Sequence, residues 1–461
     1  MRIDKLRLKN FRCFSEVELD LDEDLTVLVA ENGQGKSAVL DAIRIGLWPF
    51  VSCFDIAKNA KADSGNGIAI GDVRLIKMTH GDMARQLPAE VAIAGDYGND
   101  KSTTWVRYRD KEAKSTQTKD KGAAKQLKEW ATALQAKSRD EKQASQVELP
   151  VFGYYGTGRL WQQKKLTETA KGKDDTKEDD FYVRTFAYLN CLDPASSYKH
   201  FKEWFTWAFE SYREQQIKQL EHKGQPDDLQ DAQDRIQVIQ HAIDAFLKPV
   251  TGWHTLEYSV TREKSLILHH DEQGILDVEQ LSDGIRSMLA MVGDIAFRCI
   301  KLNPQFGVNA ARQTAGVVMI DEVDMHLHPR WQQVVLGQLK DAFPAIQFVV
   351  TTHSPQVLTT VASEHIRILR NNKIYAAPPG TEGAEPERLL KQVLGLEEIR
   401  PPAVQATKEL KEYLSLVDRD QWNSPRALEL RKLLDERYQG QEPALLEADL
   451  QIENRKWELG E

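Results

Sequence analysis

The sequence lacks long hydrophobic runs, paired cysteines and a basic excess, and each absence narrows the class of protein. No stretch approaches the roughly 18 to 20 apolar residues that a membrane helix needs. The cysteines are scattered without a CxxC pair, which argues against a zinc site and a disulfide framework: Cys13, Cys53, Cys191 and Cys299. The opening MRIDKLRLKNF alternates like a strand rather than a secretory signal. We therefore expect a cytoplasmic protein with no membrane partner.

The charge balance is mildly acidic, with 61 Lys and Arg against 70 Asp and Glu and a net charge of −9. A dedicated nucleic-acid binder usually carries a basic excess. We therefore expect any DNA contact to be local or to be supplied by a partner. A stretch rich in Lys, Ser and Thr, at about residues 99–146, is a candidate basic surface, and a solvated face is its plainer interpretation.

Hydrophobic periodicity divides the chain into alternating and helical parts. The first strands show period-2 alternation, and Leu25–Ala30 is an apolar run typical of a strand buried on both faces. A helix is expected from about Lys36 through Ile45. Residues 162–250 predict polar helices without a heptad repeat, so we expect no long coiled coil. Strand–helix alternation resumes at about 255–377, and the linkers PPGTEGAEPE and RPPA precede helices in the tail.

Residues 30–37, AENGQGKS, match the P-loop pattern GxxxxGK[ST], except that Ala30 replaces the first glycine. In such a loop, backbone N–H groups at a helix N-terminus cradle phosphate, Lys36 reaches the β- and γ-phosphates, and the Ser37 hydroxyl ligates Mg²⁺. Glycines permit the tight loop and the close approach of phosphate. The nucleotide-binding candidates in this segment are Asn32, Gly33, Gly35, Lys36, Ser37 and Ala38.

A second element, GVVMIDE at 316–322, predicts a buried strand that ends in two carboxylates. Asp321 is a candidate to hold Mg²⁺, and Glu322 is a candidate to orient or deprotonate the attacking water. The alternative is an ordinary strand ending in a solvated turn. The P-loop in the same chain disfavours that alternative.

Two further strings complete a recognisable order. LSDGIR at 281–286 stands at the head of an apolar helix, where Ser282 suits a helix N-cap, and TTHSP at 351–355 follows the apolar IQFVV. The order P-loop, insertion, LSDG, VVMIDE and TTHSP resembles the head domain of SMC/RecF-like ABC ATPases. The resemblance implies ATP and Mg²⁺ as cofactors and a head-to-head dimer with ATP in its interface. It implies further contacts to the nucleotide from Ser282, Gly284, His353 and Arg12.

The same resemblance implies an α/β fold class. We expect an ABC ATPase head with a mixed, mainly parallel sheet, an inserted helical domain and a helical C-terminal region. The expected divisions are an N-terminal lobe of the head at 1–160, the insertion at 161–254, a C-terminal lobe at 255–378 and the helical region at 379–461. The last region is the expected docking surface for a partner.

Some positions depart from the pattern or stay unassigned. His328 stands seven residues after Asp321, where these ATPases usually carry aspartate, which argues against fast hydrolysis. A metal site at His326 and His328 lacks an evident third ligand. The Q-loop is not assigned, although Gln146 precedes an apolar segment. Arg159 fits either a phosphate or interface contact or a plain salt bridge.

The tail contains Asp418-Arg-Asp420, but a helical pattern precedes it rather than the glutamate-ended strand of a Toprim nuclease. The strings YYGTGRLW, HLHP and ALLEADLQIENRKWEL resemble the ATPase subunits of Septu anti-phage systems and their retron relatives. This resemblance implies a separately encoded HNH nuclease partner and contact with DNA through the complex. Two alternatives remain open: a DNA-repair ATPase of the RecF type that acts without a nuclease, and a module that holds ATP only as a structural or sensing ligand.

Overall fold

The computed structural model describes residues 1–58, 65–98, 102–159, 182–194, 198–222, 225–262 and 264–459. The chain forms two compact units, Met1–Leu389 and Leu390–Glu461. The division expected at 378/379 lies 11 residues before this boundary, at 389/390. The division expected at 160/161 and the charged loop KGKDDTKEDD, at 171–180, lie outside the described residues.

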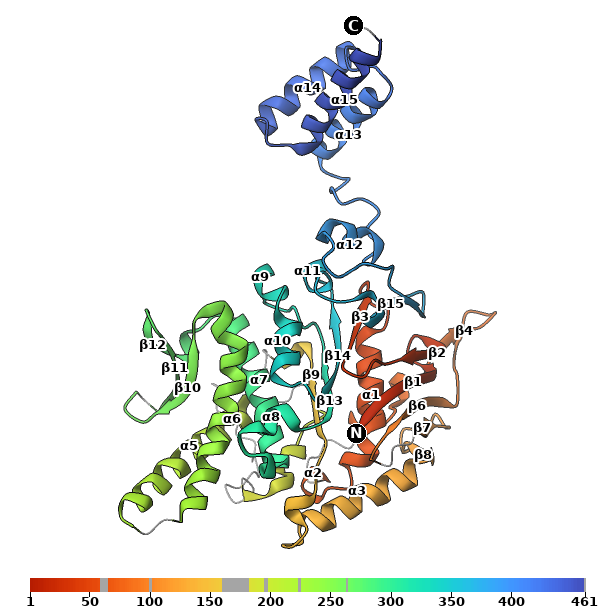
Figure 1. Ribbon diagram of the computed structural model, residues 1–461. Helices are drawn as coiled ribbons and strands as arrows, with labels where there is room; N and C mark the ends of the chain where they lie inside the picture. The colour runs from red at the N-terminus through yellow and green to blue at the C-terminus, as the bar shows by residue number, and fades with distance from the viewer. Residues whose placement is uncertain are drawn as a thin grey trace. The chain divides into compact units, whose positions relative to one another are not determined.

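The first unit is built on a six-stranded sheet of order β16-β15-β3-β14-β13-β9 (Figure 1). All neighbouring strands are parallel except β15 and β16, which confirms the expected mixed, mainly parallel sheet. Every residue of β3, β13 and β14 is buried, because helices cover both faces of the sheet. The strands are β3 (Leu25–Ala30), β9 (Val151–Tyr155), β13 (Gly316–Ile320), β14 (Ile346–Thr352), β15 (Ile366–Arg370) and β16 (Lys373–Ala376).

The register of this sheet gathers several loops at one edge. Ile320, the last residue of β13, lies beside Val350 of β14 and Tyr155 of β9. Val29 of β3 lies beside Thr352 of β14. Because these strands are parallel, the segments that follow them all leave the sheet at its carboxyl edge, where open α/β sheets bind ligands.

A second sheet is antiparallel, with the order β2-β1-β6-β7-β8, and it was not anticipated from the sequence. The helix α1 (Lys36–Val51) packs on both sheets, and Trp105 of β7 donates its indole N–H to the Gly46 carbonyl of α1 at 2.7 Å. The strands are β1 (Arg2–Phe11), β2 (Phe14–Asp20), β6 (Ala89–Asp96), β7 (Thr103–Arg109) and β8 (Lys119–Gly122), and a hairpin pairs β4 (Leu75–Lys77) with β5 (Met83–Arg85).

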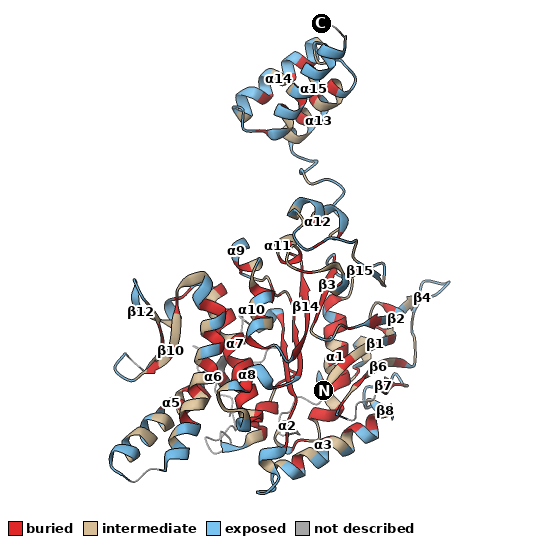
Figure 2. Ribbon diagram, in the orientation of Figure 1, coloured by how far each residue is buried: buried red, intermediate tan, exposed pale blue. Residues whose placement is uncertain are grey.

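The expected helices of the insertion are present. The helices α5 (Tyr198–Leu220) and α6 (Pro226–Thr251) pack on each other and on α7 (Asp283–Leu302), whose residues are mostly buried (Figure 2). A small antiparallel sheet joins β10 (His254–Ser259), β11 (Ser265–His270) and β12 (Gly274–Asp277). The remaining helices of the first unit are α2 (Asp55–Lys58), α3 (Ala124–Ser138), α8 (Ala310–Gln313), α9 (Pro329–Gln332), α10 (Val335–Ala342) and α11 (Pro355–Leu358), and α12 (Pro386–Gln392) crosses the boundary.

The second unit contains three longer helices, α13 (Gln405–Asp418), α14 (Pro425–Tyr438) and α15 (Pro443–Leu459). Its own core includes Leu410, Tyr413, Leu430 and Leu445. The helix α14 begins after Ser424, whose hydroxyl accepts a hydrogen bond from the Ala427 N–H at 3.2 Å. The helical tail that the sequence predicted is therefore confirmed. None of the described helices combines the length and the apolarity that crossing a bilayer requires.

Candidate nucleotide-binding site

The P-loop connects β3 to α1 at the carboxyl edge of the sheet. Gly35 has a φ of 99°, and a Cβ atom built there would lie 2.6 Å from the Phe14 ring and 2.8 Å from the Cys13 sulfur. Glycine is therefore required both by the backbone conformation and by space. Gly33 also has a positive φ, of 81°, but open space surrounds it. The exposed start of the loop, at Glu31, Asn32 and Gly33, leaves room for a ligand.

Lys36 is only 7% exposed, and its Nζ donates to the Ala30 carbonyl at 2.9 Å. Burial lowers the pKa of Lys36, and the carboxylates of Asp321, Glu322 and Asp324 oppose that shift. The contact with Ala30 uses a backbone atom alone. This explains how alanine can stand where the P-loop pattern has glycine.

The central feature of the site is the Asp321 carboxylate, which two hydroxyl groups approach. Ser37 Oγ donates to Asp321 Oδ2 at 2.9 Å, and Thr351 Oγ1 donates to Asp321 Oδ1 at 2.6 Å. The Glu322 N–H donates to the same Thr351 hydroxyl at 2.8 Å. A hydroxyl and a carboxylate side by side are hard oxygen ligands, so this donor set fits Mg²⁺. Sequence reasoning missed Thr351, although it stands within the TTHSP string.

Glu322 and His353 occupy the loops next to this cluster. Glu322 has a φ of 48°, and His326, further along the same loop, has a φ of 62°. Such left-handed conformations are uncommon outside glycine and concentrate at functional sites. His353 is half-buried directly after β14. The structure thus brings the predicted residues Lys36, Ser37, Asp321, Glu322 and His353 to one edge of the sheet.

The LSDG segment begins α7. Ser282 is exposed and occupies the N-cap position, but its side chain makes no capping hydrogen bond, so that part of the prediction is wrong. Gly284 is buried, and a Cβ atom there would lie 2.4 Å from the His326 carbonyl oxygen. The first turn of α7 therefore abuts the loop that follows Asp321. That exposed N-terminus leaves the Ser282 hydroxyl accessible.

His328 and Arg12 both have partners within the chain. The Nδ1 of His328 accepts from the Arg330 N–H at 3.2 Å and caps α9. Arg12 forms ion pairs with Asp41 at 2.7 Å and Asp72 at 2.8 Å, so a contact between Arg12 and a nucleotide stays a prediction.

Of the two remaining candidates, Gln146 and Arg159, the structure places only the Gln146 side chain relative to the site. Gln146 precedes the amino end of β9 and so lies at the opposite edge of the sheet from Asp321. The environment of the Arg159 side chain lies outside the described part of the structure.

A buried hydrogen-bond chain joins the carboxyl edge to α7, and sequence reasoning missed it. The Tyr155 carbonyl accepts from the Asp321 N–H at 2.8 Å, while the Tyr155 hydroxyl donates to Asp294 Oδ2 at 2.7 Å. Arg298 Nε donates to the same oxygen of Asp294 at 2.7 Å. Burial and the Asp294 carboxylate raise the pKa of Tyr155. A sequence signal existed, because Asp294 and Arg298 are the charged residues within the apolar run from Met288 to Ile300.

A glycine-bearing loop at the start of a helix, a lysine inside it and a hydroxyl–carboxylate pair at the carboxyl edge of a parallel sheet define the class of P-loop nucleotide-binding ATPases. The chain belongs to the AAA domain family, which matches residues 5–248. A second family, described as "AAA domain, putative AbiEii toxin, Type IV TA system", matches residues 194–359.

Similar proteins include a probable retron ATPase and a Septu protein. The chain is 29% identical to a retron Ec83 probable ATPase of Escherichia coli, over 99% of this chain and 88% of the relative. It is 35% identical to the Septu protein PtuA of Bacillus mycoides (strain KBAB4), over 27% of this chain and 18% of that protein. Among solved structures, an SMC head bound to the C-terminal winged-helix domain of ScpA has 16% identity and a TM-score of 0.47, covering 82% of this chain and 98% of that one. The expected resemblance to retron and Septu ATPases is confirmed.

Proposed function

We propose that this chain is the ATP-binding regulatory subunit of an anti-phage defence complex in the cytoplasm. Two copies clamp ATP between their heads, and the nucleotide state of the dimer controls a separately encoded HNH nuclease that cuts DNA. The near full-length similarity to a retron ATPase and the partial similarity to PtuA support the defence role. The nuclease and the dimer come from the family resemblance.

The observation that carries the ATP-binding proposal is the cluster of Ser37, Asp321 and Thr351. Two hydroxyl groups within 3 Å of one carboxylate form a ready set of oxygen ligands next to a lysine that can bind phosphate. In the proposed complex, Ser37 and Asp321 hold Mg²⁺, which neutralises phosphate charge when bound. Lys36 and the backbone N–H groups of the P-loop bind the phosphates.

Hydrolysis, where it occurs, is assigned to Glu322 and His353. Glu322 orients or deprotonates the attacking water, and His353 contacts the γ-phosphate from the end of β14. The exposed Ser282 and the backbone at Gly284 face the ATP of the second copy. We expect slow turnover, because His328 replaces the usual aspartate of the loop that crosses such dimers.

The described part of the second unit offers no arrangement typical of a nuclease at its aspartates. Asp418 accepts a hydrogen bond from Gln451 at 3.3 Å, and Asp420 pairs with Arg455 at 3.0 Å. The two carboxylates are thus engaged with α15. This supports a nuclease supplied by another protein.

A DNA-repair ATPase acting alone is the second candidate, and a basic surface on the lysine-rich stretch at about residues 99–146 would favour it. Three of these lysines pair with carboxylates: Lys119 with Asp110, Lys121 with Glu90, and Lys128 with Asp120. Paired lysines release fewer counterions on meeting a phosphate backbone, which weakens non-specific DNA binding. This candidate predicts hydrolysis stimulated by DNA.

The test is to express the chain with its operon neighbours and to measure mass, hydrolysis and DNA cleavage with and without ATP–Mg²⁺. We expect an ATP-dependent dimer, slow hydrolysis, and cleavage only in the presence of a neighbouring HNH protein. Lys36→Ala should abolish ATP binding, whereas Glu322→Gln should bind ATP and stop turnover. DNA cutting by the chain alone would refute the proposal, and DNA-stimulated hydrolysis without a nuclease partner would favour repair.

A further inference from the structure

The helix α15 is apolar on two sides, and only one of them is covered within its unit. Leu445 and Ala448 are buried in the core with α13 and α14. On another side, Leu446 is 53% exposed, Leu450 is 60% exposed and Trp457 is 84% exposed. Their spacing of four and seven residues places them in one stripe along the helix, about 16 Å long at 1.5 Å per residue. We call these three residues the α15 stripe.

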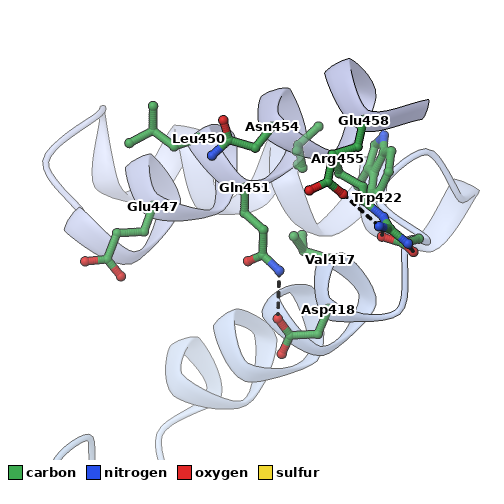
Figure 3. Close-up of a pocket in the computed structure, with 11 residues that line it drawn as sticks. Val417, Asp418, Trp422, Glu447, Leu450, Gln451, Asn454, Arg455 and Glu458 are labelled. Carbon is green, nitrogen blue, oxygen red and sulfur yellow. Dashed lines mark hydrogen bonds and ion pairs between the residues drawn. The ribbon is translucent and has the colours of Figure 1, made fainter. Parts of the chain in front are cut away.

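A groove of about 520 Å³ runs beside the stripe, between α15 and the end of α13 (Figure 3). Leu450 belongs to both the stripe and the groove. The polar lining is mainly acidic and includes Asp418, Glu447 and Glu458, with Trp422 adding an aromatic surface.

The residues that line the groove carry more negative than positive charge. Arg455 is the basic residue of the lining, and it already pairs with Asp420 at 3.0 Å and with Glu458 at 2.9 Å. The ion pairs of the described groove residues engage Asp420 and Glu458 but not Asp418 or Glu447. An apolar stripe beside unbalanced carboxylates is complementary to an apolar surface edged by cations.

We propose that the α15 stripe and its groove bind an amphipathic helix of a partner protein, one that carries lysine or arginine along the edge of its apolar face. That this partner belongs to the defence complex rests on the proposed function. A helix fits because its apolar positions recur at three and four residues and match a stripe of this length. Tryptophan is enriched among the residues that contribute most to binding at protein interfaces, and Trp457 is the most exposed residue of the stripe.

A second copy of the chain is the less favoured occupant. The whole chain carries a net charge of −9, so another copy presents an excess of the charge that the groove already has. Like charges brought together at an interface disfavour association. The net charge therefore favours a cationic helix from a different protein over a second copy.

The test uses the full chain and two labelled synthetic helices, identical except that lysine flanks the leucine face in one and glutamate in the other. We expect the lysine peptide to bind with a measurable Kd in fluorescence anisotropy and the glutamate peptide not to bind. Leu450→Glu and Trp457→Glu should each weaken binding of the lysine peptide at least tenfold. Raising salt from about 0.1 M to 1 M should weaken it as well.

Leu428→Glu is the matched control, because Leu428 is a 59% exposed leucine of α14 that does not line the groove. Thermal melts of all three variants should coincide with that of the natural chain, since each replaced side chain faces solvent. Equal binding of both peptides, no binding of either, or equal losses in Leu428→Glu would overturn the proposal. So would a wild-type oligomer that Leu450→Glu dissociates, because a second copy would then cover the stripe.

Peptide binding needs no ATP, so the two proposals fail separately. A chain that binds the lysine peptide but neither binds nor hydrolyses ATP would retain the docking surface and lose the proposed function. A chain that forms ATP-dependent dimers but does not bind the peptide would retain the proposed function and contradict the docking surface.

Discussion

At the residue scale, the hydroxyl of Thr351 holds two parts of the site in place. It donates to Asp321 and accepts from the backbone of Glu322, so it fixes the candidate metal ligand and the candidate catalytic carboxylate together. It lies one strand away from the residues that it positions. A buried threonine in such a role acts through its hydroxyl alone.

Thr351→Val should lower the turnover of ATP about tenfold or more while ATP still binds, because a hydrogen bond to a charged group contributes about 1.5–3 kcal/mol. Steady-state hydrolysis and nucleotide titration would measure both effects. Thr314→Val is the control, since Thr314 is equally buried and its hydroxyl accepts from Asn303 instead. Equal losses in the two variants would show that the effect comes from packing.

The burial of Lys36 makes a prediction about pH. Its pKa lies below the ordinary value of 10.5, so the free chain should lose the lysine charge at a lower pH than an exposed lysine would. Affinity for ATP should therefore fall as pH rises, starting below that ordinary value. Equilibrium titrations across the alkaline range test this. Lys36→Arg keeps its charge at these pH values, so its affinity should stay flat.

At the element scale, the contact between α7 and the loop after Asp321 has a steric limit. The Cβ of Gly284→Ala would lie 2.4 Å from the His326 carbonyl, which forces a shift of α7 or of the loop. Such overpacking costs about 1–3 kcal/mol. We expect reduced ATP-dependent dimerisation, measured by light scattering with ATP–Mg²⁺.

Gly337→Ala is the matched control for this substitution. Gly337 lies in α10, and open space surrounds the position of its added Cβ. Both substitutions bring the same gain in helix propensity, so a difference between them isolates the contact. Unchanged dimerisation in Gly284→Ala would contradict a role for this contact.

Hydrogen bonds link Asp321 to Tyr155 and Tyr155 to Asp294. We therefore predict that a change at Tyr155, between the sheet and α7, alters hydrolysis at the site. Tyr155→Phe removes one donor to a buried carboxylate and should destabilise the chain by about 1–3 kcal/mol. It should also lower kcat for ATP with little change in KM, because the P-loop is untouched. Tyr188→Phe is the control, since Tyr188 is a buried tyrosine whose hydroxyl donates to the Pro150 carbonyl at 2.8 Å. A kcat loss of the same size in the control would leave only a structural role for Tyr155.

The elements that could be predicted from sequence carry their signal locally. The apolar runs of β3, β13 and β14, the glycines before α1 and the periodicity of α13 to α15 each lie within one short segment. The antiparallel sheet could not be predicted, because β1 pairs with β6 across a long separation. The contact between Tyr155 and Asp294 joins residues 139 positions apart, so only the fold reveals it. The side-chain cap expected at Ser282 failed for another reason: the sequence shows the cap position but not the rotamer.

At the scale of the whole molecule, the two compact units predict that ATP binding and peptide binding can be separated by truncation. The first unit contains every described residue of the candidate nucleotide site, and the second has its own core. A chain ending at Leu389 should therefore bind ATP with unchanged affinity and lose binding of the lysine peptide. Calorimetry with ATP and anisotropy with the peptide measure the two effects. Loss of ATP binding in the shortened chain would show that the second unit supports the site.

The position of β3 in its sheet has a consequence during synthesis on the ribosome. The strand carries the P-loop early in the chain, but its two neighbours in the sheet are formed by residues 346–352 and 366–370. At about 5–20 residues per second, the growing chain waits on the order of tens of seconds before these strands exist. A nascent or prematurely terminated chain thus carries the phosphate loop without the carboxylate that completes the site. The nucleotide site is therefore assembled only when almost all of the first unit has been made, although the second unit is still to be synthesised.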